Sequence, residues 1–108
     1  MFTFVESSIF ARYLSEYLSD DEYAALQAFL VVYPDAGDIV PGSGGVRKVR
    51  WRIAGRGKSG GIRVIYYLQL RRGEIWLLTL YGKNATENIP GHILKKLKET
   101  FENASNED

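Results

Sequence analysis

The sequence predicts a single α+β domain with the order β-α-α-β-β-β-α, starting with a strand at residues 2–5. Three observations lead to this fold class. The chain has 108 residues, which suits one domain. Apolar residues near the N-terminus recur at helical spacing, and the middle of the chain holds β-prone runs separated by turns. A helical hairpin followed by an antiparallel meander favours helices packed on one face of the sheet, with the other face open to a ligand.

The N-terminal residues carry signals for two helices. Ser7 or Ser8 can cap the first helix, because a serine hydroxyl accepts a hydrogen bond from a free backbone N–H in the first turn. Ser19 and Glu22 have the spacing of a capping box for the second helix. Pro34 ends that helix, because proline disfavours helical geometry in the residue before it. We expect the two helices to form an antiparallel hairpin.

The predicted sheet follows a turn-rich connection at residues 35–45. Residues 46–53 alternate between apolar and basic side chains, which predicts a half-exposed strand with a basic outer face. A glycine-rich basic loop precedes the second strand at residues 62–70. After a tight turn, residues 74–81 are the third strand of this sheet, and residues 76–80 are expected to be buried on both faces, as in a central strand.

The last element is a helix that starts near Pro90, a favoured first-turn residue. Ile93, Leu94, Leu97 and Phe101 give it an apolar stripe. We therefore expect one domain over residues 1–102 and a frayed tail over residues 103–108.

The charge of the chain is strongly segregated although the net charge is only +1. Residues 1–40 hold one base and seven acids, whereas residues 73–108 hold four bases and six acids. The residues between them carry nine bases and no acid: Arg47, Lys48, Arg50, Arg52, Arg56, Lys58, Arg63, Arg71 and Arg72. Such a block repels itself unless it meets an anionic partner, and phosphate backbones are the usual one. Tyr66, Tyr67, Tyr81 and Trp51 are candidates for stacking on unpaired bases.

Other residue classes narrow the function. The sequence has no cysteine and one histidine, which excludes thiolate metal sites and makes a serine–histidine triad a poor explanation. No long apolar run or signal-peptide pattern is present, so we expect a cytoplasmic protein without a membrane span. The G-x-G-x-x-G match at residues 55–60 precedes a strand rather than a helix, so it lacks the context of a nucleotide-binding fingerprint.

Four segments together resemble one protein family. They are GVRKVR at 45–50, GRGKSGG at 55–61, IRVIYY at 62–67 and LTLYGKN at 78–84. In this order they resemble the RelE/HigB family of bacterial toxins, and the HigB branch most closely. The resemblance covers nearly the whole chain, and it implies a RelE-like fold.

The resemblance also implies a function and partners. It implies the toxin of a toxin–antitoxin module, a ribosome-dependent mRNA endonuclease that cuts mRNA in the ribosomal A site and so inhibits translation. The reaction is metal-independent attack of a ribose 2′-hydroxyl on the adjacent phosphate, and no cofactor is implied. The partners implied are mRNA, the ribosome and a cognate antitoxin, a HigA-like helix-turn-helix protein that binds a monomeric toxin.

The chemistry needs a base, positive donors for the phosphorane and an acid for the leaving oxygen. By position in the family motif, Lys48, Arg50, Arg63 and Lys83 are the candidate catalytic residues. Lys48 is the candidate base because arginine is a poor one, Arg63 the stabiliser of the transition state, and Lys83 the group that serves the leaving oxygen. The candidate residues for binding RNA or the ribosome are Arg47, Arg52, Arg56, Lys58, Tyr67 and Tyr81.

Two other functions fit the sequence. A ParE-like toxin that poisons gyrase would share the fold, although that branch usually lacks this density of bases on the strands. A non-catalytic module that binds RNA or the ribosome would need the basic block alone, and its binding would be sensitive to salt.

Overall fold

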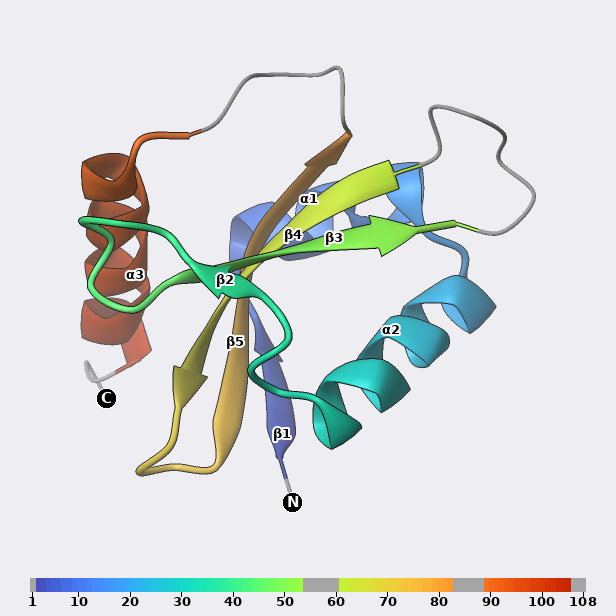
Figure 1. Cartoon of the computed structure of the whole chain (residues 1–108), viewed down its shortest axis with the longest axis horizontal. Helices are drawn as coiled ribbons and strands as arrows, with labels where there is room; N and C mark the ends of the chain where they lie inside the picture. Colours follow the sequence, from blue (N-terminus) through green and yellow to red (C-terminus); the bar gives the residue numbers. More distant parts are fainter. Residues whose placement is uncertain (1, 54–60, 83–88, 106–108) are drawn as a thin grey trace.

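The computed structural model describes residues 2–53, 61–82 and 89–105. Its elements in chain order are β1 (Thr3–Glu6), α1 (Ser8–Tyr17), α2 (Asp20–Val32), β2 (Asp38–Ile39), β3 (Arg47–Arg52), β4 (Gly61–Gln69), β5 (Glu74–Gly82) and α3 (Gly91–Ser105) (Figure 1). Within the described residues the protein is therefore α+β, with three helices and one five-stranded sheet. The short strand β2 is an addition to the predicted order.

The sheet is mixed, with the strand order β1-β5-β4-β3-β2. The strands from β2 to β5 pair with their neighbours in antiparallel fashion, which gives the predicted meander and adds β2 to its edge. β1 pairs with β5 in parallel, from Thr3 opposite Glu74 to Glu6 opposite Leu77. β5 therefore lies between β1 and β4, and its apolar residues are buried on both faces, as its composition predicts.

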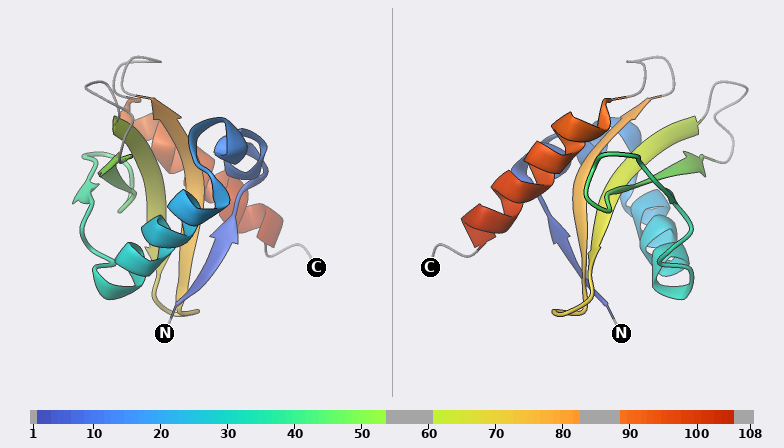
Figure 2. Two further views of the ribbon diagram at one scale, coloured as in Figure 1. Left: turned by 90° about the vertical axis from the view of Figure 1, so that its right-hand side faces the viewer. Right: turned by 60° about the vertical axis from the view of Figure 1, so that its left-hand side comes forward.

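The first two helices begin where their local signals predict, and α2 ends before Pro34 as predicted. Ser7 caps α1, because its hydroxyl oxygen accepts a hydrogen bond of 3.0 Å from the Phe10 N–H. Ser19 and Glu22 form the complete capping box of α2. α2 ends at Val32, two residues before Pro34. The helices leave their short connection in different directions and diverge across the sheet, rather than packing along each other as a tight hairpin (Figures 1 and 2).

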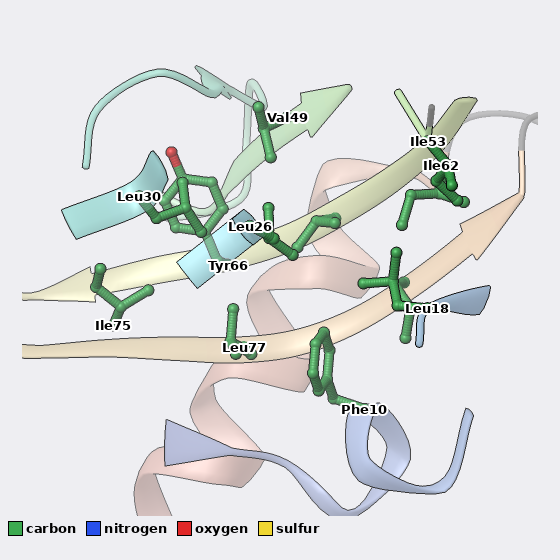
Figure 3. Packing of buried hydrophobic residues seen from close by; sticks show 12 residues of the cluster. Phe10, Leu18, Leu26, Leu30, Val49, Ile53, Ile62, Tyr66, Ile75 and Leu77 are labelled. Atoms are coloured by element: carbon green, nitrogen blue, oxygen red, sulfur yellow. The ribbon is translucent and has the colours of Figure 1, made fainter. Parts of the chain in front are cut away.

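One hydrophobic core lies between these helices and the sheet. Phe10 from α1 and Leu26 and Leu30 from α2 are fully buried there (Figure 3). The strand residues of this core alternate along β3 and β4 and, in β5, up to Leu77, after which the register shifts: Val49, Ile62, Val64, Tyr66, Ile75, Leu77 and Leu80. These side chains define the face of the sheet that α1 and α2 cover.

A second core lies on the opposite face, under α3. Leu94 of α3 packs with Val46, Ile65, Trp76, Leu78 and Tyr81, and the Trp76 and Phe101 rings meet edge to face at 5.1 Å. Figure 2 shows α3 crossing the side of the sheet that α1 and α2 do not cover. The prediction that all helices pack on one face and leave the other open is therefore wrong. The side chain of Trp76 lies on the face of the sheet that α1 and α2 do not cover. The apolar stripe of α3 packs on this face, so the helix and Trp76 bury each other.

The C-terminal helix is longer than the sequence predicts. α3 continues to Ser105, three residues beyond the end predicted from the sequence, and residues 106–108 lie outside the described range.

Among the helices of the described ranges, none combines the length and the apolarity that a bilayer crossing requires.

Candidate nucleic-acid interface

Three of the four basic residues of β3 lie on the face of the sheet that also carries α3. Val49 and Ile53 belong to the core under α1 and α2, and strand alternation directs Lys48, Arg50 and Arg52 to the other side. Arg50 and Arg52 are exposed and Lys48 is half-buried. The alternation predicted for this strand is therefore present. The surface on the α3 side of the sheet is called the basic face, and it is formed by Lys48, Arg50, Arg52 and Arg63.

The centre of the basic face is a pair of arginines on neighbouring strands. Arg50 of β3 is directly opposite Arg63 of β4, and Arg63 is directly opposite Tyr81 of β5. Directly opposed residues of an antiparallel pair have Cβ atoms about 5 Å apart, so two like charges here destabilise the free protein. In the described part of the chain, neither arginine side chain makes an ion pair or hydrogen bond. An anion between them would offset this repulsion.

Lys48 lies one step further along the same strand. Its cross-strand neighbours are Ile65 of β4 and the acidic Asp38 of β2, and the next basic position on β3 is Arg50. Residues two apart on a strand are separated by about 7 Å, which a lysine side chain can span. Lys48, Arg50 and Arg63 can therefore approach one anionic group together.

The basic face is not covered by α3 at its centre. The ends of β3 and β4 that carry Arg52 and Arg63 extend beyond this helix (Figure 1). α1 and α2, which hold the acidic Glu16, Asp20 and Asp21, pack on the opposite face. The acidic residues of α1 and α2 thus lie on the other side of the sheet from the basic residues of β3, whereas Asp38 of β2 pairs directly with Lys48.

Basic residues of α3 join this side of the molecule and were not singled out from the sequence. The Lys98 ammonium lies 4.7 Å from the centre of the Tyr67 ring and donates a hydrogen bond of 3.0 Å to the Gly44 carbonyl. The aliphatic part of Lys95 lies close to Gly44. The run Lys95, Lys96 and Lys98 was the available signal, but the negative total charge of residues 73–108 concealed it.

Arg47 is not part of the basic face. Its position on β3 has the parity of Val49, and its guanidinium donates hydrogen bonds to the carbonyls of Asp35 at 3.2 Å and Gly37 at 2.7 Å. The side chain thus ties the segment between α2 and β2 to β3. The structure therefore separates Arg47 from Arg52, Tyr67 and Tyr81, the other residues proposed to bind RNA that lie in the described ranges.

The aromatic residues differ from the stacking platform that the sequence suggests. Tyr66 is completely buried, and Tyr81 is 8% exposed, so their rings are too enclosed for a base to stack on them. The ring of Tyr67 is half-buried against Trp76 at 5.5 Å, and Lys98 lies over it. Trp51 packs against Phe29 of α2, on the other face of the sheet. The basic face is therefore a charged surface, and none of these four rings offers it a freely exposed stacking platform.

Three predicted site residues, Arg56, Lys58 and Lys83, lie outside the described residues. Within the described ranges, no three histidine, aspartate or glutamate side chains come together to form a candidate metal site. Comparison of the chain with models of known protein families finds no match.

Proposed function

We propose that the protein is a ribosome-dependent mRNA endonuclease, the toxin of a toxin–antitoxin module related to the RelE/HigB family. The observation that carries this proposal is the pair of opposed arginines, Arg50 and Arg63, without a partner among the described residues. Two adjacent guanidinium groups on a rigid sheet suit a group that gains negative charge, because each presents a planar fork to phosphate oxygens. The four sequence segments that resemble the family supply the reaction class.

The proposed reaction makes and breaks one bond at phosphorus. The ribose 2′-oxygen attacks the adjacent phosphorus and gives up its proton to a base, for which Lys48 is the candidate. The bond from phosphorus to the 5′-oxygen then breaks, and that oxygen takes up a proton, for which Lys83 is the candidate. Arg50 and Arg63 stabilise the charge of the phosphorane between these steps. The products are a 2′,3′-cyclic phosphate and a 5′-hydroxyl.

The proposed partners follow from the resemblance to the RelE/HigB family. The ribosome presents single-stranded mRNA to the basic face, and an antitoxin encoded nearby silences the toxin. The net charge of +1 suits such dependence, because a nearly neutral protein gains little from binding nucleic acid indiscriminately.

The proposal is tested by inducing the chain in bacteria and mapping the 5′ ends of mRNA. We expect growth arrest and new 5′ ends within codons. Arg63→Ala should lower cleavage by about 100-fold or more, as expected for loss of one donor to a transition-state oxyanion. Arg71→Ala is the matched control, because Arg71 is an exposed arginine at the other end of β4, in the turn to β5.

Three results would contradict the proposal. Full activity of both Arg63→Ala and Lys48→Ala would remove the basic face as the active site. DNA damage with intact transcripts would favour a gyrase-poisoning toxin. Intact transcripts together with salt-sensitive binding to ribosomes would favour a non-catalytic RNA-binding module.

A further inference from the structure

Tyr81 carries a buried polar group that the fold does not use. The residue is 8% exposed, and its hydroxyl oxygen is buried without a hydrogen-bond partner among the described residues. A native protein rarely leaves such a group unpaired, because burial removes its bonds to water. A hydroxyl retained at this cost points to a role that the folded chain alone does not reveal.

A β-bulge turns this tyrosine towards the basic face. Ile65 pairs with Thr79 and the next residue, Tyr66, pairs with Leu77, so Leu78 is an extra residue in β5. Without the extra residue, Tyr81 would share the parity of Leu77 and face α1 and α2. With it, Tyr81 packs in the core under α3 and lies directly opposite Arg63. Bulges are frequent beside active sites, where they redirect a side chain in this way.

We propose that Tyr81 is a positioning residue for Arg63: its hydroxyl accepts a hydrogen bond from the guanidinium when RNA phosphate binds. The inference rests on the proposed function and adds a residue to its site. The remaining N–H groups of Arg63 then point at the phosphate, while the enclosed hydroxyl itself does not touch the RNA. Bonds of this kind are often long in a free enzyme and tighten in the complex with substrate.

The protonation of the hydroxyl agrees with this role. Burial raises the pKa of Tyr81, and the nearby positive charge of Arg63 opposes that rise in part. The tyrosine therefore remains neutral near pH 7 and offers oxygen lone pairs to the guanidinium. The charge of Arg63 acts on the hydroxyl even in the free chain, as expected for neighbours across two paired strands.

The test measures the rate of mRNA cleavage by the full chain in a cell-free translation reaction. Tyr81→Phe should lower the rate by about tenfold, the effect of losing one hydrogen bond to a charged group. Arg63→Ala should lower it further, and the double variant should cut at the rate of Arg63→Ala alone, because Tyr81 acts through Arg63. Tyr13→Phe, on α1 at the opposite face, is the matched control and should cut at the wild-type rate.

Each other outcome overturns the inference in a recognisable way. Full activity of Tyr81→Phe would overturn it and leave the proposed function intact. An equal loss from Tyr81→Phe in the wild-type and Arg63→Ala backgrounds would show that Tyr81 does not act through Arg63. A lower melting temperature of Tyr81→Phe would show that the hydroxyl has a structural partner. Unchanged cleavage by Arg63→Ala would overturn this inference and the role of Arg63, whereas no cleavage by the wild-type chain would overturn the proposed function itself.

Discussion

Replacing Tyr66 by phenylalanine tests the account of how the end of α2 is attached to the sheet. The Tyr66 side chain is completely buried between β4 and α2, with its hydroxyl directed away from the centre of the core (Figure 3). The hydroxyl donates a hydrogen bond of 2.8 Å to the Pro34 carbonyl and accepts one of 2.9 Å from the Gly37 N–H. One side-chain oxygen therefore holds both ends of the turn that leads from α2 to β2.

The expected cost follows from the two groups that lose their partner. Phenylalanine fills the same volume, so no large cavity forms. The Gly37 N–H remains buried and unpaired, and the Pro34 carbonyl is partly buried. An unsatisfied buried group costs about 1–3 kcal/mol, so we expect Tyr66→Phe to lower the free energy of unfolding by about 3 kcal/mol. That is a large fraction of the roughly 5–15 kcal/mol that stabilises a typical domain.

Urea unfolding of three matched variants measures this cost. Tyr67→Phe removes a hydroxyl without a hydrogen bond among the described residues and should change the unfolding free energy by less than about 0.5 kcal/mol. Tyr81→Phe removes an unpaired buried hydroxyl and should leave stability unchanged or slightly raised. The reasoning is refuted if Tyr66→Phe costs less than about 0.5 kcal/mol, or if Tyr67→Phe costs as much as Tyr66→Phe.

Two further predictions concern the pH dependence of stability and the contact between α3 and Pro41. Burial raises the pKa of Tyr66 above its ordinary value of 10.0, so the folded protein holds this proton more tightly than the unfolded chain. The resulting stability is complete below pH 10.0 and is lost as the pH rises through the folded pKa, by up to about 1.4 kcal/mol per pH unit. Unfolding titrations should show a shallower alkaline loss for Tyr66→Phe than for wild type, and equal slopes would contradict this. Gly91→Ala should destabilise by about 2 kcal/mol in urea, although alanine favours helices, because the new Cβ would overlap the Pro41 carbonyl oxygen. A gain in stability would show that α3 can shift away from Pro41.

Local signals allowed much of the fold to be predicted. The capping box at Ser19 and Glu22 and the end of α2 before Pro34 depend on residues within a few positions of each other. The alternation of β3 likewise needs only neighbouring residues, and it correctly separates Arg50 from Val49. Such features are legible in a sequence because the interactions that cause them join near neighbours in the chain.

The candidate site was predicted in part for the same reason. The residue types and the parity of Lys48, Arg50 and Arg52 are local properties, and the structure places them on one face. The register that sets Arg50 opposite Arg63 is not local, because it depends on how two strands separated by a loop align. Arg47 lies apart from this group because its guanidinium donates hydrogen bonds to the carbonyls of Asp35 and Gly37, which are ten or more residues away in the chain.

The sequence by itself determined the α+β class, most of the element order, the helix caps and the basic character of β3. Only the tertiary structure decided that β1 pairs in parallel with β5, that α3 covers the second face of the sheet, and that a bulge at Leu78 turns Tyr81 towards Arg63. These features depend on contacts between residues far apart in the chain. The residues of a short strand do not specify which strand it pairs with. One extra residue in a strand moves every later side chain to the opposite face of the sheet.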